Sequence, residues 1–165
     1  MSQLPRRAFA AATFAAAASL AAPAARAATP TPTVGDDGLI RVRSAYGIDE
    51  TIARIRADIA AKGILFFSAV DQSRLAADAG IKLPPSTLLT FGNPPLGAQF
   101  LTANPASGLD WPVRLLVHQD ESGAVWAVYT DFAWIARRHG ITNRREQFAK
   151  ASSVVESITS TVRAR

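Results

Sequence analysis

The sequence predicts an α+β fold, a two-layer sandwich in which helices cover one face of a mostly antiparallel sheet. Segments with the two-residue alternation of strands are interspersed with segments that show the three- and four-residue spacing of helices. Two of the strand-like segments flank a short turn, as in an antiparallel hairpin. The length of 165 residues with 48% apolar residues suits one domain, and the absence of cysteine excludes a disulfide scaffold or a thiolate-ligated metal site.

The first 27 residues are predicted to be a removable export signal. Arg6-Arg7 precede a weakly hydrophobic, alanine-rich run, and an A-R-A motif at 25–27 predicts cleavage before Ala28. The paired arginines resemble a twin-arginine signal, and an ordinary secretory signal is the alternative. The run is shorter than a bilayer-spanning helix, so we expect a periplasmic mature chain without a transmembrane segment.

Cleavage would change the charge balance of the protein. The whole chain has a net charge of +5, and loss of Arg6, Arg7 and Arg26 lowers it to +2. That excess is too small to indicate nucleic-acid binding, and no nucleic-acid partner is expected.

An alternating strand and an isoleucine-rich helix open the predicted domain. Residues 39–46 alternate apolar and polar side chains, which indicates a strand with one covered face. Isoleucines recur from Ile48 to Ile59 at spacings of four, three and four, which predicts a helix. Asp49 is placed to cap the start of this helix and Gly63 to end it.

A second strand, a short helix and a third strand follow. Residues 64–70 are rich in aromatic and branched side chains, which favours a strand buried on at least one face. Residues 72–79 are predicted to form an alanine-rich helix that ends at Gly80, and residues 86–91 a third strand. Residues 92–97, with the sequence G-N-P-P-L-G, are so dense in turn-forming residues that a shaped loop is predicted.

The C-terminal half is predicted to contain a hairpin and two helices. Residues 113–118 and 124–130 bracket the turn Q-D-E-S-G, and Asp131 caps a helix that Gly140 ends. Residues 143–162 carry an apolar stripe at helical spacing. The stripe consists of Phe148, Ala151, Val155, Ile158 and Val162. Two alternatives explain it: docking on the body of the domain, or a homodimer contact through the C-terminal helix.

Three sequence segments, G-I-L-F-F-S-A-V-D, F-G-N-P-P-L-G and W-P-V-R-L-L-V-H, occur in this order. Together they resemble the domain of unknown function 302 family over about residues 45–141. The resemblance implies a compact α+β domain with a mostly antiparallel sheet, often dimeric, and no agreed activity. Many members have a histidine where this chain has Gln72, so no metal or proton-transfer role is expected at that position.

With this resemblance the chain divides into four parts. They are a signal peptide over 1–27, a linker over 28–38, the family domain over 39–141 and a C-terminal helix over 142–165.

The loop over residues 92–97 is the strongest candidate for a ligand site. Its glycines let a ligand approach the backbone closely, Asn93 offers amide donors, and the prolines fix the loop's shape. The predicted ligand-binding residues are Gly92, Asn93, Pro94, Gly97, Arg114 and Tyr129. The competing interpretation is that the loop only reverses the chain and places Leu96 in the core.

Aromatic side chains are expected to line a pocket beside this loop, and the candidates are Trp111, Trp126, Tyr129 and Phe132. Strand alternation places Trp126 and Tyr129 on opposite faces, so they are not expected to line the same pocket.

No strong catalytic motif is present: the sequence has no glycine-rich phosphate loop, no G-x-S-x-G and no H-E-x-x-H. We therefore expect a non-enzymatic module that binds a small molecule or a protein, without a cofactor or a metal. One alternative is a small hydrolase or isomerase that uses Asp71, Asp131 or His118 as acid or base. Another is a dimeric structural protein.

A metal site would have to combine His118 or His139 with acidic residues. The acidic candidates are Asp71, Asp131 and Glu121. Each histidine has a simpler explanation, His118 as a polar residue of an edge strand and His139 at the negative end of a helix.

Overall fold

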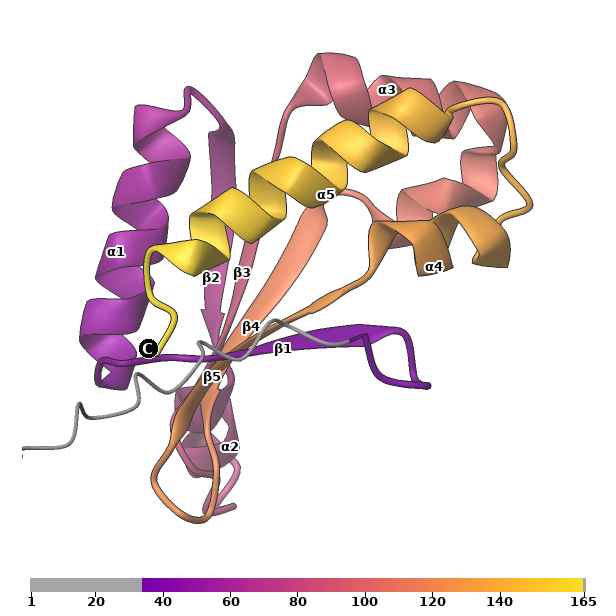
Figure 1. Ribbon diagram of the computed structural model, residues 1–165. Helices are drawn as coiled ribbons and strands as arrows, with labels where there is room; N and C mark the ends of the chain where they lie inside the picture. Colours follow the sequence, from indigo (N-terminus) through magenta and orange to yellow (C-terminus); the bar gives the residue numbers. More distant parts are fainter. Residues whose placement is uncertain (1–33, 165) are drawn as a thin grey trace, which may run out of the picture.

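The computed structural model describes residues 34–164 (Figure 1). The predicted export signal and residues 28–33 of the predicted linker lie outside the described residues. Residues 34–38, which were predicted to be extended linker, instead form a turn: Gly35 N–H donates to Leu39 O at 3.0 Å, and Val34 pairs with Ile40. This segment therefore folds back on the first strand.

Five strands form one antiparallel sheet in the order β1-β5-β4-β3-β2. The strands are β1 (Leu39–Arg43), β2 (Leu65–Asp71), β3 (Ser86–Gly92), β4 (Val113–Gln119) and β5 (Val125–Thr130). The predicted hairpin is β4–β5, in which Leu115 lies opposite Tyr129. The α+β class predicted from the sequence is confirmed.

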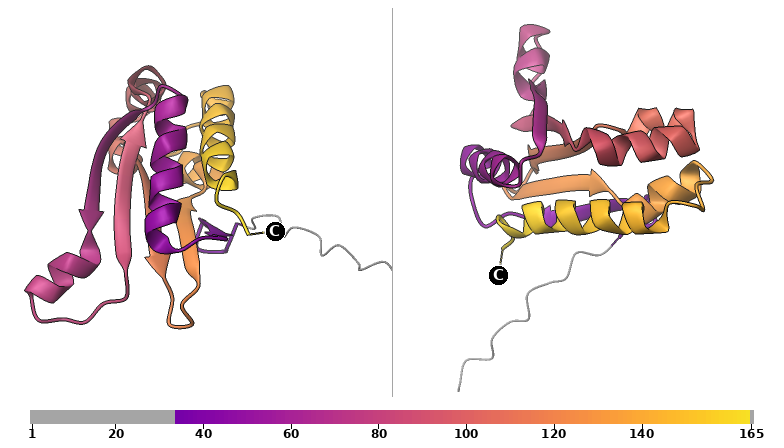
Figure 2. Two further views of the ribbon diagram at one scale, coloured as in Figure 1. Left: turned by 90° about the vertical axis from the view of Figure 1, so that its left-hand side faces the viewer. Right: turned by 90° about the horizontal axis from the view of Figure 1, so that it is seen from above.

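The helices pack mainly over one face of this sheet. They are α1 (Ile48–Ala61), α2 (Gln72–Asp78), α3 (Pro94–Ala103), η1 (Pro105–Asp110, a 3-10 helix), α4 (Phe132–Arg138) and α5 (Arg145–Ser160). Figures 1 and 2 show α1 and α5 on the same side of the sheet, whereas α2 projects away from the rest of the domain. The core lies between the sheet and the covering helices α1 and α5.

Helix α1 follows from its isoleucine spacing, with Ile55 and Ile59 fully buried. Gly63 ends the helical segment with a left-handed φ of +64°, as predicted. The predicted cap is wrong, because Gly47 is the N-cap and no side chain bonds there. Asp49 is the second residue of the helix, two positions past the cap, and its charge still interacts favourably with the positive end of the helix.

Strand β2 differs from the prediction of a strand buried on at least one face. Six of its seven residues are exposed, and only Phe66 is half-buried. The physical reason is its place at the edge of the sheet, where it pairs with β3 alone. Aromatic and branched residues favour any strand, so composition does not distinguish an edge strand from a central one.

The C-terminal stripe is buried within this chain. All five of its residues are at most 5% exposed. Phe148 stacks on Phe100 of α3 with ring centroids 4.3 Å apart. Docking on the domain therefore accounts for the stripe, and its side chains are not free to form a homodimer seam.

Candidate functional site

The segment predicted as a loop over residues 92–97 is the start of a helix. Asn93 caps α3, because its side-chain oxygen accepts a hydrogen bond from Leu96 N–H at 3.0 Å. Pro94 and Pro95 take the first two helical positions, where a missing N–H costs nothing. Proline and asparagine are common both in turns and at helix starts, which is why the loop prediction was wrong.

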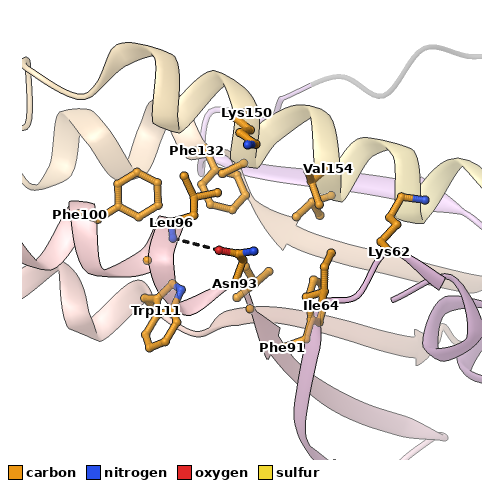
Figure 3. Close-up of a pocket in the computed structure, with 15 residues that line it drawn as sticks. Lys62, Ile64, Phe91, Asn93, Leu96, Phe100, Trp111, Phe132, Lys150 and Val154 are labelled. Carbon is orange, nitrogen blue, oxygen red and sulfur yellow. Dashed lines mark hydrogen bonds between the residues drawn. The ribbon is translucent and has the colours of Figure 1, made fainter. Parts of the chain in front are cut away.

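A pocket of about 380 Å³ opens beside this helix start. It lies between α3, the end of β3, the start of β4 and α5, with the segment after α1 at its edge (Figure 3). Its apolar lining includes Ile64, Phe91, Leu96, Phe100, Trp111, Val113, Phe132, Ala151, Val154 and Val155. This volume and this mainly apolar lining are typical of sites for small molecules.

Two glycines determine how Trp111 forms the wall of the pocket. A Cβ atom at Gly97 would overlap the Trp111 indole, and one at Gly92 would lie 3.2 Å from its Nε1. The indole can therefore lie directly against the backbone of β3 and α3. The predicted close approach at these glycines exists, and the group that makes use of it is a side chain of the same protein.

The polar side chains of the pocket are hydrogen-bond donors. Lys62 and Lys150 contribute ammonium groups, Trp111 an indole N–H and Asn93 an amide whose oxygen already accepts from Leu96. Lys62 forms an ion pair with Asp58 at 2.5 Å, whereas Lys150 has no ion-pair partner among the described residues. No carboxylate lines the pocket.

The family model for "Domain of unknown function DUF302" matches residues 40–160. This chain belongs to the DUF302 family. The match begins in β1 and ends in α5, so it includes every element that lines the pocket.

The fold of this DUF302 chain is also found in a solved structure. The crystal structure of an uncharacterized conserved DUF302 protein from Bacillus stearothermophilus is similar, with a TM-score of 0.70 and 19% identity. The similarity covers 76% of this chain and 98% of that one. At this level of identity the likeness shows a shared fold.

Longer curated relatives match part of this chain. A protein named fluoride-specific ion channel FluC 1 from Brucella suis is 39% identical over 112 residues, which are 68% of this chain and 44% of the relative. A protein named FluC 2 from Brucella melitensis is also 39% identical, over 42% of its length. The chain thus spans less than half of the curated relatives it matches. No helix within residues 34–164 has an apolar stretch long enough to span a bilayer.

The structure brings together only some of the predicted ligand-binding residues. Gly92, Asn93 and Gly97 line the pocket, and so do Trp111 and Phe132 among the predicted aromatic residues. Pro94 is exposed and begins α3 without lining the pocket. That any of these residues binds a ligand stays a prediction.

Arg114 and Tyr129 do not line this pocket with Asn93, and both line a separate, small cavity beside Asp110 instead. Strand alternation turns Arg114 to the face opposite that of its neighbour Val113, which lines the pocket. Tyr129 is 4% exposed in the core, and this burial raises the pKa of its hydroxyl above the usual value. Trp126 is half-buried on the other face of β5, so the predicted separation of Trp126 and Tyr129 is confirmed.

A buried charge cluster around Asp110 was not found from the sequence. The Asp110 side chain is 3% exposed and lies 2.6 Å from His139 Nε2, 2.9 Å from an Arg114 nitrogen and 3.3 Å from an Arg138 nitrogen. These partners join η1, β4 and the end of α4, so the cluster fastens three elements together. His139 lies 29 positions after Asp110, and no spacing motif connects residues so far apart.

The candidate acid–base residues do not form a catalytic group in the described part of the chain. Asp71 caps α2 by accepting from Arg74 N–H, and Asp131 caps α4 by accepting from Trp134 N–H. The strand register places Asp71 and His118 near one end of the sheet and Asp131 at the other. No hydrogen bond joins any two of these three side chains. Within residues 34–164 no three histidine or acidic side chains converge as metal ligands would.

Proposed function

We propose that this chain is a binding module whose pocket beside α3 holds a small, largely apolar molecule. The observation that carries the proposal is the cavity of about 380 Å³ walled by aromatic and aliphatic side chains, with a few donors at its edge. An apolar pocket with few, well-placed polar groups is the usual form of a small-molecule site, because the walls provide affinity and the polar groups orient the ligand.

The chemistry of the lining supports binding over catalysis. No carboxylate, imidazole, hydroxyl or thiol lines the pocket. The only ionisable side chains of the lining are Lys62 and Lys150, so the acid, base or nucleophile that hydrolysis or isomerisation needs would have to come from these two lysines alone. The acidic candidates Asp71 and Asp131 are engaged as helix caps outside the pocket.

We also propose that the protein works in the periplasm after export. Support comes from the sequence alone, from Arg6-Arg7, the alanine-rich run and the A-R-A motif before Ala28. N-terminal sequencing of the protein from a periplasmic fraction is expected to begin at Ala28. Intact precursor in the cytoplasm would contradict export.

A neutral fluorescent probe tests the proposed pocket. N-phenyl-1-naphthylamine, which brightens in apolar surroundings, is expected to bind the wild-type protein. In Val154→Phe the new ring fills part of the cavity, and affinity is expected to fall at least about tenfold.

Ser153→Phe is the matched control. Ser153 precedes Val154 on α5, is exposed and does not line the pocket, so this variant should bind the probe like the wild type. Thermal unfolding of all three proteins checks that the fold persists. Equal probe binding in the two variants, or none in the wild type, would contradict the proposal.

A further inference from the structure

We propose that the pocket selects an amphipathic anion, an apolar body that carries a single carboxylate or comparable oxyanion. The charged end lies beside Lys150 at the edge of the pocket. This inference rests on the proposed binding function and adds the chemical class of the ligand.

The hydrogen-bonding side chains of the pocket point to an acceptor. Lys62, Lys150 and Trp111 can only donate, and Asn93 has its amide N–H groups left after its oxygen accepts from Leu96. A ligand that carries donors would find few side-chain acceptors here. A carboxylate carries only acceptors, and hydrogen bonds in which one partner is charged are the stronger ones.

The charge at the pocket edge favours an anion. The chain has three lysines, Lys62, Lys82 and Lys150, and two of them line the pocket. Asp58 balances Lys62, whereas Lys150 is paired with no described acid, including Glu146 one turn earlier on α5. The edge therefore keeps an unbalanced positive charge beside an apolar wall, where an anion is attracted more strongly than in open water.

The arrangement of the lining separates a charged end from an apolar body. Figure 3 shows Lys62 and Lys150 along the α5 side of the pocket, with Phe91 and Trp111 across from them. A molecule that spans this space would place its apolar part between the rings and its charge at Lys150. A fully polar anion would leave the apolar walls uncovered, and an uncharged apolar molecule would gain no ion pair with Lys150.

A matched ligand pair tests this charge selection. We would displace N-phenyl-1-naphthylamine with 2-naphthoate and with 2-naphthamide, which share a ring system and differ in charge. The wild-type protein is expected to bind 2-naphthoate about 3- to 10-fold more tightly than the amide, since ion pairs near the surface contribute little each. The preference should shrink at high salt.

Variants of Lys150 test whether this lysine causes the preference for the acid over the amide. In Lys150→Gln the preference for the acid should fall to within about twofold, and Lys150→Arg should restore it because the charge returns. Lys82→Gln removes an exposed lysine outside the pocket and should leave the preference unchanged. Lys150 is exposed on α5, so these changes should leave folding intact.

The outcomes separate this inference from the proposed function. If the neutral probe binds and the acid and the amide displace it equally, the inference about ligand charge is wrong and the proposed binding function is retained. A preference that persists in Lys150→Gln would also overturn it. If the probe does not bind the wild type at all, the proposed function itself fails.

Discussion

The two faces of the sheet come from the same strands and have opposite character. On the face covered by helices, Leu89, Leu115 and Ala127 are fully buried and the pocket lies at the margin of this core. On the open face, the neighbouring residues Leu116 and Trp126 are only half-buried. The strand residues Phe91 and Val113 that line the pocket lie on the covered face, and α3 and α5 provide much of the rest of its wall.

The largest expected difference between the faces is in stability. Leu115→Ala leaves a cavity in the closed core and should lower the free energy of unfolding by about 2–5 kcal/mol. Leu116→Ala, one position along on the open face, should cost about 1 kcal/mol because its side chain is already partly solvated. Urea unfolding measures both. Equal losses would mean that the two faces are equally closed.

A substitution at Gly97 tests whether the Trp111 indole lies against helix α3. In a helix, Gly→Ala ordinarily stabilises by about 1 kcal/mol. At Gly97 the added methyl group would overlap Trp111, so Gly97→Ala should instead destabilise by about 1–3 kcal/mol and weaken probe binding. Gly108→Ala is the control, because its Cβ would meet only ordinary contacts, the nearest at 4.0 Å. Stabilisation by Gly97→Ala would show that the indole does not lie against α3.

The smallest effect is a pH dependence on the open face. Hydrogen bonds from the Ser122 side chain and from Trp126 Nε1 lower the pKa of Asp120 to about 2. Because the pKa of Asp120 is lower in the folded protein, ionised Asp120 stabilises the fold. This stabilisation is fully present above the unfolded pKa near 3.8 and is lost as the pH falls through about 2. The Trp126 indole N–H resonance should therefore shift with a midpoint near pH 2. A flat response, or the same response in Asp120→Asn, would contradict the assignment.

Local patterns predicted much of the fold. The β4–β5 hairpin, α1 and the stripe of α5 follow from periodicity within single segments. The start of α3 was misinterpreted because its Asn-Pro-Pro sequence is equally typical of a turn. The exposure of β2 depends on its position in the sheet, which local sequence does not encode.

The candidate site was predictable only in part, for the same reason. Gly92, Asn93 and Gly97 are neighbours in sequence and lie together in the pocket. Lys62 and Lys150 come from distant segments, and only the tertiary fold brings both to the pocket. Long-range proximity of this kind depends on the tertiary fold, as does the contact between Asp110 and His139.

The most direct test of the central claim follows the indole N–H resonances of the protein during a titration with 2-naphthoate. The chain has three tryptophans, and each reports a different region: Trp111 the pocket, Trp126 the open face and Trp134 helix α4. We predict that the Trp111 resonance shifts with saturation while those of Trp126 and Trp134 stay in place. A shift of Trp126 without one of Trp111 would place binding on the open face and contradict the account.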